Sequence, residues 1–105
     1  MQNTIDAISN LHRREILRLL WEGDGMSSGE IARRLPVTWQ STSRNLKVLR
    51  TAGLVEETRL GTQRYYRANR EALRPLEDLL HQMWEQNLDQ IVALSEKEQR
   101  GKRRR

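Results

Sequence analysis

The 105-residue sequence predicts a single, mainly α-helical domain with one small β-hairpin. Three observations support this fold class. Apolar residues recur at helical spacing in the first half of the chain, a short segment around residue 60 changes to a strand-like composition, and a long helical pattern then resumes. A chain of this length fits one domain. We expect residues 1–98 to form that domain and residues 99–105 to be a basic, disordered tail.

Two helices are expected at the N-terminus. The first is short and covers residues 5–8. Asn10 is a suitable N-cap for the second helix, which runs to about Glu22 and ends at Gly23-Asp24-Gly25. The buried stripe of the second helix is predicted to consist of Leu11, Ile16, Leu17, Leu19 and Leu20.

A short third helix and a longer fourth helix follow, separated by a tight turn at Pro36. Ser27 or Ser28 is expected to cap the third helix, and Thr38 the fourth, which ends at Gly53. Two helices joined in this way form a helix-turn-helix. Their inward-facing residues are predicted to be Ile31, Ala32, Leu35, Leu46, Val48, Leu49 and Ala52.

The segment after the fourth helix has the pattern of a β-hairpin. Residues 54–60 and 63–67 are strand-like and flank a turn at Gly61-Thr62. A long helix is expected from about residue 69 to residue 96, with Pro75 near its first turn. A hairpin directly after a helix-turn-helix makes the fold a winged helix-turn-helix, in the order α-α-α-α-β-β-α with a long C-terminal dimerisation helix.

Basic charge is concentrated in the middle of the chain. Residues 33–70 hold nine basic and two acidic side chains, whereas residues 1–32 and 71–98 each hold more acidic than basic ones. The tail adds five basic residues, as many as the formal net charge of +5. Because the basic region coincides with the fourth helix and the hairpin, it favours a polyanionic partner. The tail either adds non-specific DNA affinity or has no role.

The outward face of the fourth helix is suited to the major groove of DNA. Its amide side chains can pair with adenine, Arg44 can pair with guanine, and its hydroxyl groups and Lys47 can hold phosphates. Arginines of the hairpin can reach phosphates or the minor groove. The alternative is a polar helix face that binds nothing. The predicted DNA-binding residues are Thr38, Trp39, Gln40, Ser41, Ser43, Arg44, Asn45, Lys47, Arg59, Arg64 and Arg67.

Three stretches carry a resemblance to a known family. They are residues 13–20 (RREILRLL), residues 41–55 (STSRNLKVLRTAGLV) and residues 61–67 (GTQRYYR). Together they resemble the ArsR family of bacterial and archaeal winged-helix repressors, and the middle stretch is the most specific. The resemblance covers about residues 5–95. It implies a cytoplasmic homodimer whose repression of transcription is relieved by some signal.

Several positions depart from the usual pattern of that family. Asn10-Leu11-His12 stands where Asp-Pro-Thr is usual, Trp39-Gln40 where Gln-Pro is common, Thr42 where Val is usual, and Asn45 where His is usual. Trp39 can pack on a thymine methyl group or a sugar, or instead against Pro36. These departures leave the predicted fold intact and the operator sequence undefined.

The sequence argues against a metal centre. It contains no cysteine, so the Cys-x-Cys site that family members carry in the helix before the turn is absent. A second kind of family site uses carboxylates and histidines of the C-terminal helix, where this chain offers Asp78, His81, Glu85 and Asp89. One histidine is few for zinc. We expect no metal and no cofactor, with a metal-responsive repressor as an alternative.

The C-terminal helix carries more apolar residues than a small core is expected to cover. We therefore expect it to form a homodimer contact, and a small apolar effector is the alternative occupant of its stripe. A two-fold dimer would place its two recognition helices about one DNA turn (~34 Å) apart. The predicted dimerisation residues are Leu80, Met83, Trp84, Leu88 and Ile91.

These observations predict a homodimeric, sequence-specific DNA-binding repressor, which could repress its own gene. The alternative from another class is a winged-helix protein-interaction module without specific DNA binding. An enzyme is not expected, because the chain has no cysteine and its two histidines lie in different helices with no nucleophile nearby in the pattern. No apolar run is long enough for a membrane span and no signal peptide is evident, so a cytoplasmic location is expected, with an effector still to be identified.

Overall fold

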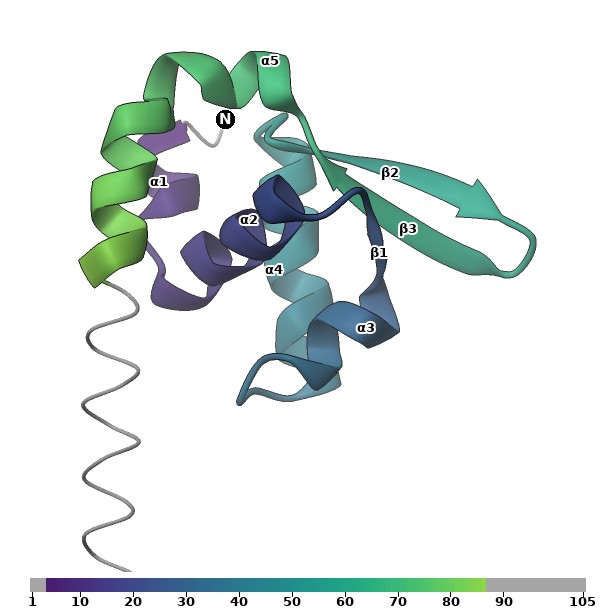
Figure 1. Ribbon diagram of the computed structural model, residues 1–105. Coiled ribbons are helices and arrows are strands. Elements are labelled where there is room, and N and C mark those ends of the chain that lie inside the picture. The colour runs from purple at the N-terminus through teal and green to yellow at the C-terminus, as the bar shows by residue number, and fades with distance from the viewer. Residues whose placement is uncertain (1–3, 87–105) are drawn as a thin grey trace, which may run out of the picture.

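The computed structural model describes residues 4–86 and has the predicted winged helix-turn-helix fold (Figure 1). The expected helices and hairpin are present in the expected order. After the 3-10 helix of residues 74–76, the chain continues as a helix through residues 77–86, called the C-terminal helix below. The elements are α1 (Thr4–Ile8), α2 (Leu11–Glu22), β1 (Met26–Ser27), α3 (Ser28–Arg33), α4 (Trp39–Thr51), β2 (Val55–Leu60), β3 (Gln63–Ala68), α5 (Arg70–Leu73) and the 3-10 helix η1 (Arg74–Leu76).

The three predicted N-caps are confirmed. The side chain of Asn10 accepts hydrogen bonds from the backbone N–H groups of two residues in the first turn of α2. Ser27, rather than Ser28, caps α3, and Thr38 caps α4 by accepting a hydrogen bond from the Ser41 N–H at 3.1 Å. Each cap satisfies N–H groups that have no partner within the helix, which fixes where the helix begins.

A short strand, β1, was not predicted. Its two residues pair antiparallel with β3, Met26 opposite Tyr66 and Ser27 opposite Tyr65, so the sheet order is β1-β3-β2. Two residues are too few to show the alternation by which a strand is recognised. The pairing ties the start of α3 to the hairpin, because Ser27 is also the N-cap of α3.

The predicted long C-terminal helix is interrupted near its start. Asn69 caps α5, and the 3-10 helix η1 with Pro75 follows before the regular helix of residues 77–86. Proline has no N–H to donate and its ring clashes with the preceding turn, which explains the interruption. The predicted helix end at residue 96, the dimerisation residues Leu88 and Ile91, and the tail of residues 99–105 lie outside the described residues.

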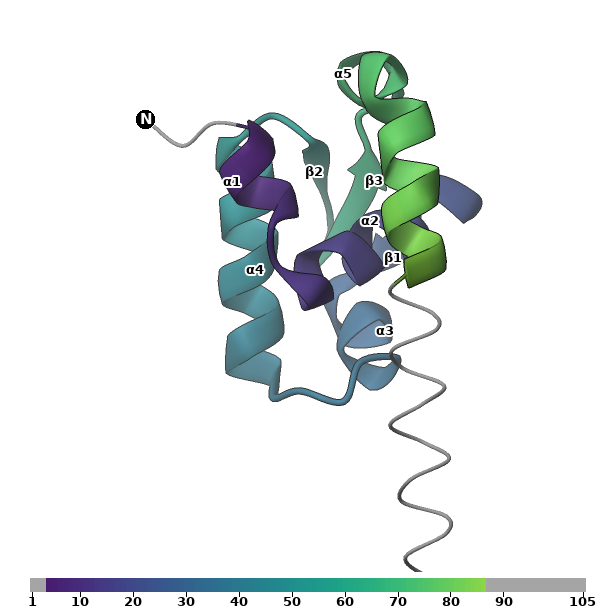
Figure 2. The same ribbon diagram turned by 90° about the vertical axis from the view of Figure 1, so that its left-hand side faces the viewer.

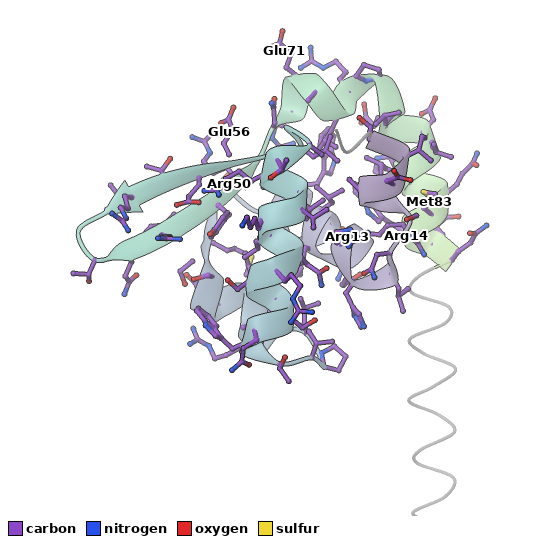
Figure 3. All side chains as sticks on the ribbon, turned by 180° about the vertical axis from the view of Figure 1, so that it is seen from behind. Arg13, Arg14, Arg50, Glu56, Glu71 and Met83 are labelled. Atoms are coloured by element: carbon purple, nitrogen blue, oxygen red, sulfur yellow. The ribbon has the colours of Figure 1, made fainter. Side chains whose placement is uncertain are left out.

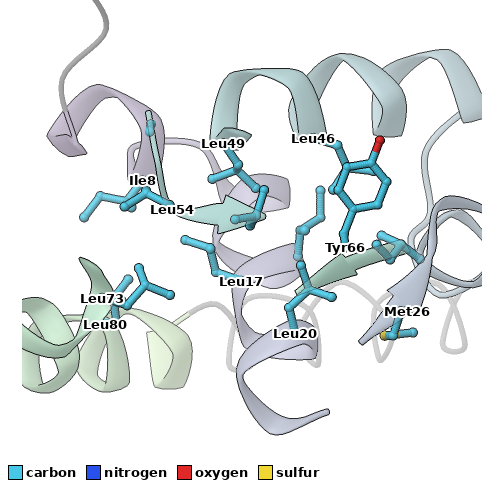
Figure 4. Packing of buried hydrophobic residues seen from close by; sticks show 14 of the residues in the cluster. Ile8, Leu17, Leu20, Met26, Leu46, Leu49, Leu54, Tyr66, Leu73 and Leu80 are labelled. Atoms are coloured by element: carbon cyan, nitrogen blue, oxygen red, sulfur yellow. The ribbon is translucent and has the colours of Figure 1, made fainter. Parts of the chain in front are cut away.

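The core lies between α2, α4, the root of the hairpin and the C-terminal helix (Figure 4). Most of the side chains in this cluster are almost completely inaccessible to solvent, and they come from every α-helix and from all three strands of the described chain. The largest fully buried apolar side chains are Ile8, Ile16, Leu17, Leu20, Ile31, Leu46, Leu49, Leu54, Leu73 and Leu80. This core holds α4 and the wing on one rigid support.

The structure corrects the expectation that a single chain cannot cover the stripe of the C-terminal helix. Leu80 is 0 % and Trp84 5 % exposed within the single chain. The indole Nε1 of Trp84 donates a hydrogen bond to the backbone oxygen of Arg14 in α2 at 2.9 Å. Leu80 and Trp84 are therefore core residues, whereas Leu79 on the same helix is 40 % exposed. Within residues 4–86, no helix is long and apolar enough to cross a membrane.

Candidate nucleic-acid interface

Helix α4 has one buried and one exposed face. Thr42, Leu46 and Leu49 are buried against the core, as the helical spacing predicts for the two leucines. Most of the polar and basic side chains between these positions face solvent. The exposed side chains of this helix include Trp39, Gln40, Ser43, Arg44, Lys47 and Arg50.

The C-terminal end of α4 fixes the direction in which the wing leaves it. Gly53 has a φ of +78°, and the N–H of Leu54 donates to the oxygen of Leu49 at 3.0 Å, while that of Gly53 donates to Arg50 at 2.9 Å. These two bonds form a Schellman motif, which needs a left-handed residue that glycine supplies without strain. Asn69 returns from the end of β3 and donates its side-chain N–H to the Gly53 oxygen at 3.0 Å.

The wing presents two of its three predicted arginines on the face turned toward α4. In the register of β2 and β3, Arg59 lies opposite Arg64, and Glu57 opposite Tyr66. Directly paired residues share a face of the sheet and alternate along each strand. Arg67 therefore lies on the other face, where a Cβ at Gly25 would come within 3.3 Å of its Cγ. Arg67 does not share the surface of the other two arginines.

A cleft lies between α4 and the wing. One part, of about 360 Å³, is lined by residues of α4 together with Glu57, Arg64 and Tyr66. An adjoining part, of about 660 Å³, extends from Trp39 and Ser43 to the N-terminal turn of α3 and the wing tip. Exposed basic side chains from α4 and the wing surround this cleft, so its surface potential attracts polyanions.

Trp39 is the largest exposed apolar group of the cleft. It is 51 % exposed at the first position of α4, and it lines both parts of the cleft with Ser43, Arg64 and Tyr66. Pro36 is itself exposed, so Trp39 is not buried in the turn of the helix-turn-helix. An indole in this position can contact an apolar group of a bound molecule without first leaving a core.

An acidic side chain joins α4 to the wing at the inner end of the cleft. The Glu57 carboxylate accepts a hydrogen bond from Arg50 Nη1 at 2.5 Å and lies 3.6 Å from Arg64 Nε. Figure 3 shows Arg50 where α4 meets the strands. The pKa of the Tyr66 phenol is raised, first by burial and then by the Glu57 charge, so this phenol stays neutral at physiological pH.

The prediction that Asn45 faces DNA is wrong. Asn45 is 9 % exposed, and its Oδ1 accepts a hydrogen bond from Arg13 Nη1 at 3.2 Å. Arg13 also donates from Nε to the oxygen of Ala7 at 2.7 Å and from Nη2 to that of Asp6 at 3.1 Å. Asn45 thus fastens α4 to α1 and α2 through Arg13. Asn45 lies three residues after Thr42 and four before Leu49, so the helical spacing places it on the buried face, and its polar chemistry led the sequence prediction to the other face.

Two charged residues that line the 360 Å³ part of the cleft, Arg50 and Glu57, were not predicted from the sequence. Arg50 follows Ser43 by seven residues and Lys47 by three, so the helical period already places it on the exposed face. No sequence pattern predicted that Glu57 lies in the cleft, because a single acidic residue in a basic segment is typical of ordinary surface charge. Its contact with Arg50 depends on how the hairpin folds back on α4.

The C-terminal helix shows no metal site in its described part. Among residues 4–86, no group of three or more histidine, aspartate or glutamate side chains is placed to hold a metal ion. His81 instead lies edge-on against Trp84, with ring centroids 5.1 Å apart, and its Nε2 is 3.8 Å from Glu77 Oε1. Asp78 and Glu85 are exposed on the same helix, and Asp89 lies outside the described residues.

The fold and the basic cleft define a winged helix-turn-helix protein of the kind that regulates transcription. A helix-turn-helix domain family matches residues 8–58. The chain is 36 % identical over 92 residues to the HTH-type transcriptional regulator Rv2034 of Mycobacterium tuberculosis, covering 88 % of this chain and 85 % of the relative. It is 38 % identical over 73 residues to the transcriptional repressor SdpR of Bacillus subtilis, covering 70 % of this chain and 80 % of that relative.

Solved structures agree with these relatives. The homodimeric winged helix-turn-helix DNA-binding domain Mb0332 of Mycobacterium bovis, a possible ArsR-family regulator, superposes with a TM-score of 0.65 at 33 % identity over 80 % of this chain and 77 % of that one. An ArsR-like transcriptional regulator of Rhodococcus sp. RHA1 superposes with a TM-score of 0.61 at 30 % identity, covering 86 % of this chain and 84 % of that one. The chain belongs to the ArsR family of winged helix-turn-helix, DNA-binding proteins. The members of this family are transcriptional regulators and not enzymes.

Proposed function

We propose that this protein is a homodimeric repressor that binds its operator with α4 in the major groove and the wing near the adjacent minor groove. The observation that carries the proposal is the common cleft of α4 and the wing, around which exposed amide, hydroxyl and basic side chains gather. A helix of this size fits the major groove, and its N-terminal residues meet base edges there.

The side chains divide into two roles in this proposal. Trp39, Gln40, Ser43 and Arg44 lie in the first turns of α4, are exposed, and are assigned to the bases. Lys47 and Arg64, which line the cleft, Arg59 on the same face of the wing, and the hydroxyl groups of Thr38 and Ser41 are assigned to phosphates and the minor groove. Two predicted residues are left out of this set: Asn45, because it is buried, and Arg67, because it lies on the other face of the wing.

The proposed dimer surface includes α1 and the C-terminal helix. Both helices lie on the side of the molecule turned toward the viewer in Figure 2. Ile5 of α1 is 59 % exposed, and Leu79 of the C-terminal helix is 40 % exposed. Met83 is partly buried on the same helix and would add apolar area. Leu88 and Ile91, which lie outside the described part of the chain, are also proposed to contribute to the dimer contact. The homodimer of the M. bovis domain supports a two-fold arrangement.

The signal to which the protein responds is proposed to be something other than a metal ion. The absence of cysteine removes thiolate ligands, and the histidine of the C-terminal helix is packed on Trp84. We also propose that the protein acts in the cytoplasm, where its operator would be accessible, and that its own promoter is the first candidate operator.

Fluorescence anisotropy tests the proposal. The purified protein is titrated onto the duplex upstream of its own gene and onto a scrambled duplex of equal length and composition, across a series of salt concentrations. Tight binding to the native duplex that persists at about 0.2 M salt, where purely electrostatic binding has weakened, supports a sequence-specific repressor. Equal binding to both duplexes that collapses with salt contradicts operator recognition there and favours the protein-interaction module.

A further inference from the structure

Glu57 occupies an unusual position for an acidic residue. Among the described residues that line the 360 Å³ part of the cleft, it is the sole acidic side chain, and Arg44, Lys47, Arg50 and Arg64 are the basic ones. A carboxylate at a surface meant for phosphates repels them. Its presence there therefore needs a reason other than affinity.

The Glu57 carboxylate connects two elements that meet DNA. One oxygen accepts from Arg50 in the last turn of α4 at 2.5 Å, and the other lies 3.6 Å from Nε of Arg64 on β3. The Glu57 side chain is 16 % exposed, against 45 % for Arg50 and 50 % for Arg64. The acid is thus held inside the cleft while both arginines keep a solvent-facing side.

This arrangement affects cognate and non-cognate DNA differently. The planar guanidinium group presents several N–H donors, so an arginine bound to a carboxylate can still donate to a phosphate from its other edge. That geometry is available only when the duplex fits against α4 and the wing together. A loosely bound duplex would have to draw the arginines away from Glu57 and leave the acid facing phosphates, which costs free energy.

We propose that Glu57 is a specificity-determining positioning residue, which holds Arg50 and Arg64 in the cleft so that they bind phosphates of a fully docked operator and are withheld from non-specific DNA. The inference rests on the proposed DNA-binding function and deepens it. It adds to that function a device that lowers affinity for the wrong sequence rather than raising affinity for the right one.

The test compares Glu57→Gln with Glu56→Gln. Both variants lose one negative charge, and Glu56 is exposed on the opposite face of β2, across from Arg67 (Figure 3). Affinities for the native and the scrambled duplex are measured by anisotropy across a salt series. Thermal melting at one protein concentration checks that each variant is folded.

The expected result is a change confined to Glu57→Gln. It binds the scrambled duplex about threefold to fivefold more tightly, as the release of exposed ion pairs allows, and the ratio of native to scrambled affinity falls by a similar factor. The salt dependence on the scrambled duplex steepens by about 0.9 for each additional phosphate contact. Glu56→Gln keeps the wild-type affinity ratio.

A second variant separates positioning from simple charge. Glu57→Asp keeps the negative charge but is one methylene shorter, so it cannot reach both arginines, and it is expected to lower the affinity ratio as well. An unchanged ratio in Glu57→Gln, or an equal fall in Glu56→Gln, overturns the inference and leaves the proposed function standing. Equal binding of the wild-type protein to both duplexes overturns the proposed function and this inference with it.

Discussion

At the scale of single residues, α4 divides neighbouring side chains between the core and the cleft. Arg44 is exposed, whereas Thr42 is 0 % exposed and Asn45 9 %. The three lie within four positions of one helix, so the direction in which each side chain points, rather than its chemical type, decides its role. Exposed residues of this helix are therefore expected to govern binding, and buried polar ones stability.

Arg44→Ala should weaken operator binding. An arginine that reads guanine through two hydrogen bonds contributes about 1–3 kcal/mol of discrimination, so the affinity for the native duplex should fall while that for a scrambled duplex changes less. Anisotropy on both duplexes measures the effect. Arg74→Ala is the matched control, because Arg74 is exposed in η1, away from the cleft. Equal losses in the two variants would remove Arg44 from the base-reading role.

Thr42→Val should stabilise the fold. Thr42 Oγ1 is buried and has no hydrogen-bond partner among residues 4–86, and a buried unsatisfied hydroxyl costs about 1–3 kcal/mol. Valine keeps the branched shape and removes the hydroxyl, so we expect a gain of about 1 kcal/mol and a rise in melting temperature of about 4–8 °C. Thr42→Ser, which keeps the hydroxyl and deletes a methyl group, should lower it. A lower melting temperature in Thr42→Val would mean that the hydroxyl has a partner.

At the scale of elements, α3 is held by a capping box that joins it to β1. The Glu30 N–H donates to Ser27 Oγ at 3.2 Å, and the Ser27 N–H donates to Glu30 Oε1 at 3.2 Å. The bond from the Ser27 backbone is the main cause that lowers the pKa of Glu30 below its ordinary value of 4.5. The ionised carboxylate is thus the form that stabilises the turn.

The stability difference between wild type and Glu30→Gln should depend on pH. Because the folded pKa of Glu30 is lowered, its contribution is fully present above 4.5 and is lost as the pH falls through the folded pKa. The wild-type advantage should therefore be larger near neutral pH than at about pH 3, in urea unfolding at both values. Glu56→Gln corrects for the general loss of one charge. An advantage that is the same at both pH values would contradict this role.

The elements that carry local sequence signals were predicted correctly, and those that depend on distant contacts were not. Asn10, Thr38, Gly53 and Gly61-Thr62 mark ends and turns through their own backbone preferences, and the structure confirms each of them. The strand β1 and the ion pairs of Glu57 arise only when the hairpin folds back onto the helices. A linear pattern does not contain that information.

At the scale of the whole molecule, a line of contacts connects the wing to the C-terminal helix. Arg70, just after β3, lies 4.8 Å over the ring of Trp21 in α2 and donates to its backbone oxygen at 2.6 Å. Trp21 in turn lies 6.3 Å from Trp84 in the C-terminal helix, measured between ring centroids. The wing and the C-terminal helix thus share one aromatic support, so in the proposed dimer the placement of the C-terminal helices would set the spacing of the two wings.

The surface of α1 and the C-terminal helix should be the one that dimerises. An arginine buried without a partner in an apolar interface costs several kcal/mol, so Leu79→Arg should shift the protein toward monomer at micromolar concentration. Sedimentation velocity measures the shift. Leu60→Arg is the control, since Leu60 is 62 % exposed at the wing tip, far from that surface. Operator affinity should fall in Leu79→Arg, because a monomer contacts one half-site only. A Leu79→Arg protein as dimeric as the wild type would place the dimer contact on another face.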